Sequence, residues 1–188
     1  MTTREKILEI AYRSFAERGY GRTSMGSIAE ELGITRPALY YHFASKEDLL
    51  LATYQMIDPL VDVSTEAVLA CSNVGAYCRA LDALVASITA NLHDDERRNR
   101  FVATVEAASD QIPAVLESAR AQYEATCAMF KSVLDHGKAI GAIAPTLDTD
   151  TAKQYLASYI YGVGDIMLRG SKIDVDATRT LVIQGLLA

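Results

Sequence analysis

Apolar residues recur every three or four positions along most of this chain of 188 residues, and they do not alternate with polar residues as in a half-buried strand. Near the start, this spacing is carried by Ile7, Leu8, Ala11 and Phe15. The pattern therefore predicts an all-α fold of about nine helices, in which three short helices precede longer ones.

Residues that favour helix ends divide this pattern. Gly19 and Gly33 are expected to end the first two helices, because glycine readily adopts the left-handed conformation common after a helix. Ser24 and Thr35 are expected to cap the second and third helices with their hydroxyl groups. Two short helices joined by a turn that contains glycine form a helix-turn-helix, which we predict at about residues 24–43.

A proline marks the predicted domain boundary. Pro59 is expected to end or kink the fourth helix, so we predict one domain over residues 1–58 and another over residues 59–188. The net charge of the whole chain is −6, whereas residues 1–50 hold seven basic and seven acidic residues. An acidic body argues against nonspecific coating of nucleic acid, but it allows a local surface that reads DNA.

The cysteines and the N-terminus indicate a cytoplasmic protein. Cys71, Cys78 and Cys127 lack the spacing of a zinc site, so we interpret them as reduced, buried thiols, with a redox sensor as the alternative. Charges at Arg4 and Lys6 argue against a signal peptide. No apolar stretch is long enough to predict a membrane span.

The sequence GITRPALYYHF, residues 33–43, gives the second helix of the motif an unusual face. Leu39 and Phe43 are four positions apart and are expected to be buried. The second helix of a helix-turn-helix lies in the major groove of DNA, with its N-terminal residues at the base edges. The predicted DNA contacts are Thr23, Ser24, Thr35, Arg36, Pro37, Ala38, Tyr40, Tyr41 and Lys46.

These residue types suit different parts of DNA. The guanidinium of Arg36 matches guanine O6 and N7, and the small Pro37 and Ala38 let the backbone approach the bases. The two tyrosines can reach phosphates with their hydroxyl groups, although they can also be ordinary half-buried aromatics. Lys46 and the hydroxyl pair at residues 23–24 lie at helix starts, where phosphate is favoured.

The stretch TSMGSIAEELGITRPALYYHFASKEDLL, residues 23–50, resembles the DNA-binding motif of the TetR family of transcriptional regulators. The resemblance covers about residues 4–52. It implies a two-fold homodimer, a C-terminal domain for ligand binding and dimerisation, and release from a pseudo-palindromic operator when a small-molecule effector binds. Within the family a repressor is the commoner role. Gly26 departs from the longer polar side chain of many relatives, which weakens the expectation of a base contact there.

The predicted C-terminal domain contains candidate residues for a ligand pocket and for a dimer interface, but no specific motif marks them. Aromatic or soft side chains suited to a ligand pocket are Tyr54, Tyr77, Phe101, Tyr123, Met129 and Tyr155, each of which can equally be a core residue. Ser158 and Gly162 share one helix face and would let another helix approach closely. That helix can belong to a second protomer or to the same chain.

Two other classes of function compete with a regulator. An enzyme would need a phosphate-binding loop, a nucleophile elbow or paired carboxylates, and the sequence shows none of these motifs. We therefore predict neither catalytic residues nor a cofactor nor a metal site. A helical protein-interaction module is the other alternative, and a mobility-shift assay with genomic DNA fragments would separate it from a regulator.

Overall fold

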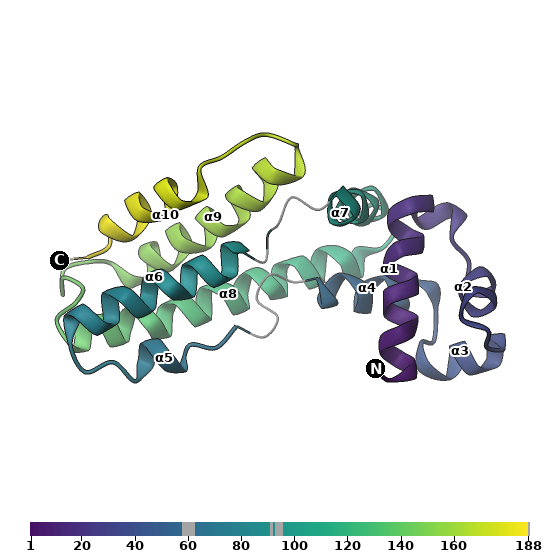
Figure 1. Ribbon diagram of the computed structural model, residues 1–188, viewed down its shortest axis with the longest axis horizontal. Coiled ribbons are helices and arrows are strands. Elements are labelled where there is room, and N and C mark those ends of the chain that lie inside the picture. Colours follow the sequence, from purple (N-terminus) through teal and green to yellow (C-terminus); the bar gives the residue numbers. More distant parts are fainter. Residues whose placement is uncertain (58–62, 91, 93–95, 188) are drawn as a thin grey trace. The chain divides into compact units, whose positions relative to one another are not determined.

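The computed structural model describes residues 1–57, 63–90, 92 and 96–187. Within these ranges the chain is all-helical (Figure 1). The helices are α1 (Thr3–Arg22), α2 (Met25–Leu32), α3 (Arg36–His42), α4 (Lys46–Met56), α5 (Glu66–Leu69), α6 (Val74–Ala90), α7 (Glu96–Ala108), α8 (Pro113–Ala139), α9 (Thr149–Leu168) and α10 (Val175–Gln184). The predicted all-α fold is confirmed. The additional helix is α5, a four-residue turn too short to show an apolar period.

The chain packs as two compact units. The N-terminal unit comprises Met1–Asp58 and Asp94–Arg120, and the C-terminal unit comprises Pro59–His93 and Ala121–Ala188. By packing, α7 thus joins the helices of the predicted N-terminal domain. The division at residue 58 stays a prediction about function, and Pro59 lies outside the described residues.

The N-terminal unit is built around α1, which packs against α2, α4 and α7 (Figure 1). Phe15 of α1 is fully buried, and so are Ile28 of α2, Leu39 of α3 and Leu49 of α4. The same apolar period that predicts these helices therefore supplies one shared core. This core holds α2 and α3 against α1, and it fixes which face of α3 is left to solvent.

Helix ends in this unit follow the predicted chemistry with one difference. Ser24 accepts a hydrogen bond from the Ser27 N–H, Thr35 accepts one from the Ala38 N–H, and Gly33 is left-handed with φ 70°. Gly19 also has positive φ, 76°, but the helical segment resumes after it as far as Arg22. Gly19 therefore kinks α1 instead of ending it.

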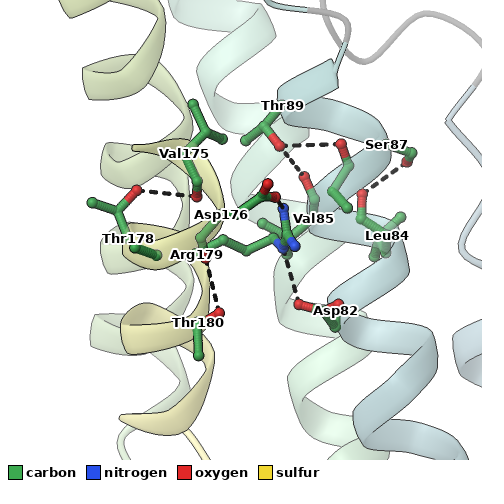
Figure 2. A network of polar contacts seen from close by, with 12 residues as sticks. Asp82, Leu84, Val85, Ser87, Thr89, Val175, Asp176, Thr178, Arg179 and Thr180 are labelled. Atoms are coloured by element: carbon green, nitrogen blue, oxygen red, sulfur yellow. Dashed lines mark hydrogen bonds and ion pairs between the residues drawn. The ribbon is translucent and has the colours of Figure 1, made fainter. Parts of the chain in front are cut away.

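The C-terminal unit has its own core, which α6, α8, α9 and α10 supply. Arg179 of α10 lies between two carboxylates, as Figure 2 shows. Its Nε donates to Asp82 of α6 at 2.9 Å, and its Nη1 donates to Asp176 at 2.6 Å. The bond to Asp82 joins α10 to α6, whereas Asp176 belongs to α10 itself. None of the helices in the described ranges has both the length and the apolar character needed to cross a bilayer.

Candidate DNA interface

The turn between α2 and α3 is closed by backbone hydrogen bonds. The Gly33 N–H donates to the Glu30 carbonyl at 3.0 Å, and the Ile34 N–H donates to the Ala29 carbonyl at 3.0 Å. This pairing satisfies carbonyl groups at the end of α2 and ends the helix in a tight turn. Because Thr35 then caps α3, the start of the second helix has a defined direction.

Helix α3 has one buried face and one exposed face. Leu39 is buried and Phe43 follows it into the core, as predicted. Arg36, Pro37 and Ala38 are exposed. The exposed fractions are 49% for Tyr40 and 87% for Tyr41. The interpretation of the tyrosines as half-buried aromatics therefore fits Tyr40 but not Tyr41, whose exposed ring and hydroxyl are well suited to a nucleic-acid surface.

Most predicted contacts lie on this one surface, but the Thr23 side chain does not. Thr23 is buried, and its hydroxyl donates to the carbonyls of Ser14 at 3.1 Å and Gly19 at 2.9 Å. The hydroxyl therefore closes the kinked end of α1, and a phosphate contact by this side chain stays a prediction that its burial does not favour. Ser24 is exposed, although its hydroxyl is engaged in capping α2.

Lys46 also has partners within the protein. Its Nζ donates to the carbonyls of Tyr20 at 2.9 Å and Thr23 at 3.1 Å, and it lies 4.0 Å from the centre of the Tyr20 ring. The ammonium thus connects the start of α4 to the end of α1. A phosphate contact by Lys46 remains a prediction, and the structure adds a fastening role that sequence spacing does not reveal.

Two residues near this surface were missed by sequence reasoning. The guanidinium of Arg4 lies 5.0 Å from the centre of the Phe43 ring, at the end of α3. Tyr20 lies beneath Lys46, and burial, followed by the charge of Glu47, raises the pKa of its hydroxyl. Arg4 and Phe43, like Tyr20 and Lys46, are far apart in the sequence, so no local sequence pattern predicts that they are in contact.

Not every arginine of the N-terminal unit is available to a nucleic acid. Arg13 and Arg18 both pair with Glu31 of α2, the latter at 3.2 Å. Arg36 is exposed, and its guanidinium lies against Gly26 of α2. The positive charge offered on the α2–α3 surface is therefore smaller than the basic residues of the unit suggest, and Arg36 is its central member.

The six candidate pocket residues are divided between the two units. Phe101 is buried in the core of the N-terminal unit beside Tyr12, at 5.2 Å between ring centres, and Tyr54 packs against the same core. Tyr77 is buried in the core of the C-terminal unit and donates to the Val133 carbonyl at 3.0 Å. These three are therefore better explained as core residues, because each fills an apolar cluster.

The other three candidates lie in the C-terminal unit. Tyr123 lies beside Tyr161 at 5.9 Å between ring centres, and its hydrogen bond with the Cys127 thiol raises the pKa of its hydroxyl. Met129 packs against the core from a partly buried position. Tyr155 lies on the surface of α9 instead of facing inward. Among these three candidates, Tyr123 combines an aromatic ring with the polar neighbours Tyr161 and Cys127.

Ser158 and Gly162 line a shallow groove of about 360 Å³ on the surface of α9 and α10, together with Tyr155 and Leu181. Leu181 is 68% exposed. A Cβ atom on Gly162 would meet no atom within 4 Å, so packing within the protomer does not require glycine here. Among the described residues, no group of histidine, cysteine and carboxylate side chains is arranged to hold a metal ion.

Known proteins that resemble residues 7–53 are DNA-binding regulators, in agreement with the helix-turn-helix of α2 and α3. The family model described as bacterial regulatory proteins of the tetR family matches residues 7–53. The chain is 43% identical over 54 residues to the HTH-type transcriptional regulator AcrR of Shigella flexneri, a match that covers 29% of this chain and 25% of that protein. Several of the most similar curated relatives are likewise matched over only about a quarter of their length.

Two longer matches extend over the rest of the chain. The HTH-type transcriptional repressor BepR of Brucella suis is 28% identical over 177 residues, covering 90% of this chain and 82% of BepR. The structure of SmeT, the repressor of a Stenotrophomonas maltophilia multidrug efflux pump, has a TM-score of 0.76 at 21% identity and covers 100% of this chain and 92% of that one. The likeness to SmeT shows a shared fold. With the helix-turn-helix and its exposed face, the match of residues 7–53 and the local matches to related regulators show that the chain carries the DNA-binding domain of the TetR family of bacterial transcriptional regulators.

Proposed function

We propose that this protein is a homodimeric repressor that binds a pseudo-palindromic operator in the cytoplasm and leaves it when a small-molecule effector binds. One observation carries the DNA-binding part of the proposal. The exposed face of α3 presents Arg36, Pro37, Ala38, Tyr40 and Tyr41, while Leu39 anchors the helix in the core. Arginine and tyrosine on an exposed recognition helix suit base edges and phosphates.

The repressor role is supported by what related proteins are known to do. BepR is a transcriptional repressor, and SmeT is the repressor of an efflux pump. A structure of SmeT is a complex with triclosan. The alternative is an activator, since the related FasR of Mycolicibacterium smegmatis is one. A reporter gene placed behind the operator separates the two roles, because deletion of a repressor raises expression and deletion of an activator lowers it.

The dimer part of the proposal rests on the groove of α9 and α10. Tyr155 and Leu181 expose apolar surface beside Ser158 and Gly162. Since the space over Gly162 is open in the protomer, its lack of a side chain is best explained by a helix from a second copy. A two-fold dimer would place two α3 helices on half-sites about one helical turn of DNA apart, or slightly more.

Effector binding is proposed for the C-terminal unit, with Tyr123 and Met129 as candidate contacts. An effector that releases DNA must bind free protein more tightly than operator-bound protein, by about 1–3 kcal/mol if the coupling is typical. Linkage makes this effect reciprocal, so the operator must weaken effector binding by the same factor.

The test begins with selection of bound sequences from random duplex DNA, followed by mobility shift with the selected operator. Tight binding that survives competitor DNA is expected, with two related half-sites in the selected sequence. The proposal would be contradicted if competitor DNA abolished binding to every duplex sequence tested. Metabolites are then screened for release of the operator. A compound that binds free and operator-bound protein with equal affinity is excluded as the effector, because such binding cannot shift the protein off the operator.

A further inference from the structure

Arg36 lies across the place that a side chain at residue 26 would occupy. A Cβ atom built on Gly26 would lie 2.5 Å from Nη2, 2.7 Å from Nε and 2.8 Å from Cζ of Arg36. Such distances are too short for real contacts, so any other residue at this position would displace the guanidinium. Gly26 is the second residue of α2, and Arg36 is the first residue of α3. One arginine thus lies over the first turn of the preceding helix.

No hydrogen bond or ion pair with the described residues accounts for this position of Arg36, which is exposed. Arg13 and Arg18 differ, because the carboxylate of Glu31 holds both of them. The N–H donors of the Arg36 guanidinium are therefore available to bind DNA. The guanidinium can take this position because Gly26 has no side chain.

We propose that Gly26 determines which base pair Arg36 reads, because it lets the guanidinium approach DNA from above α2. This inference rests on the proposed function, and it names Gly26 as a specificity-determining residue that acts through Arg36. The guanidinium fork of arginine pairs with O6 and N7 of guanine in a fixed geometry, so a displaced fork meets a different base edge. Gly26 itself needs no contact with DNA.

The decisive variant is Gly26→Ala. The methyl group would displace only the far end of a flexible, exposed side chain, and alanine favours a helix more than glycine does. The variant is therefore expected to fold. Gly75→Ala is the matched control, because Gly75 is the second residue of α6 in the other unit, and its closest contact would be an ordinary 3.6 Å from Nη1 of Arg79.

The experiment measures affinity for a panel of single-base variants of the selected operator. It compares the full-length wild type, Gly26→Ala, Arg36→Ala, the double variant and Gly75→Ala. We expect the wild type to discriminate roughly 5–150-fold at one base pair of each half-site, the range of a bidentate arginine contact. Gly26→Ala is expected to abolish or move this preference. In the Arg36→Ala background the Gly26→Ala change should have no further effect, and Gly75→Ala should match the wild type.

A second measurement needs no DNA. The Nε–Hε signal of Arg36 in a nitrogen-15 NMR spectrum should shift on Gly26→Ala and stay unchanged on Gly75→Ala. An unchanged signal would overturn the inference, and so would a Gly26→Ala effect on base preference that persists without Arg36. If the wild type bound no duplex DNA, both the proposed function and this inference would be wrong. If the wild type binds its operator but Gly26→Ala still changes base preference in the Arg36→Ala background, only this inference is wrong.

Discussion

The candidate DNA contacts of the N-terminal unit lie mostly on one short segment, whereas the tyrosines that sequence analysis proposed for a ligand pocket in the C-terminal unit come from separate helices. Residues 35–41 supply nearly the whole exposed face of α3. Tyr77, Tyr123 and Tyr155 come from α6, α8 and α9, and they lie respectively in the core, beside another tyrosine and on the surface. A reading surface on a single helix can thus be recognised from local spacing, while a pocket between helices cannot.

The largest effect expected from this comparison concerns the two cores. Phe15 and Phe130 are both fully buried, the first in the N-terminal unit and the second in the C-terminal unit. Replacing either with alanine should lower the free energy of unfolding by about 3–5 kcal/mol, through lost apolar contact and a residual cavity. Urea denaturation followed by circular dichroism measures the loss.

The two substitutions should differ in what is lost first. Phe15→Ala is expected to abolish operator binding at urea concentrations where most helical signal remains, because α3 is held by the Phe15 core. Phe130→Ala should affect effector binding first. If both variants lost operator and effector binding at the same urea concentration, the two units would unfold together and the comparison would break down.

A second prediction concerns the surface of the C-terminal unit. Gly162→Leu should leave the protomer folded, because space over this residue is open. It should weaken a dimer by about 2–3 kcal/mol, since a side chain inserted into a close helix contact forces the helices apart. Sedimentation velocity at several concentrations measures the shift toward monomer. Gly162→Ala is the milder control, and a wild type that is monomeric at micromolar concentration would contradict the prediction.

Sequence reasoning succeeded where structure depends on neighbours along the chain. The caps Ser24 and Thr35, the left-handed Gly33 and the buried Leu39 all follow from local spacing, and all four are present. It failed where partners are distant in the sequence. The bonds from Lys46 to the end of α1 span more than twenty residues, so only the fold brings them together.

Lys46 provides a third prediction, which separates fastening from DNA contact. Lys46→Met should lower the free energy of unfolding by about 1–2 kcal/mol, because two charge-assisted hydrogen bonds and the contact with the Tyr20 ring are lost. Base preference should stay unchanged. Thermal denaturation measures stability, and operator affinity at several salt concentrations measures the number of phosphate contacts. Unchanged stability with a salt slope reduced by about 1 per half-site would instead assign the ammonium to phosphate.

The smallest expected effect concerns ion pairs in the two units. Arg179 is only 15% exposed, but its partner Asp176 is 85% exposed and Asp82 is 47% exposed, so water screens both pairs. Arg179→Met should therefore lower the free energy of unfolding by only about 0.5–1 kcal/mol, and 1 M salt should remove most of the difference. Glu31→Gln is the matched change in the N-terminal unit, because Glu31 binds two half-exposed arginines. Its effect should be equally small, since no fully buried charge is left behind in either variant. A loss above about 2 kcal/mol for Arg179→Ala that persists in high salt, beside a small loss for Arg179→Met, would show that the side chain stabilises α10 through apolar packing of its stem. The C-terminal unit would then depend on Arg179 far more than the N-terminal unit depends on Glu31.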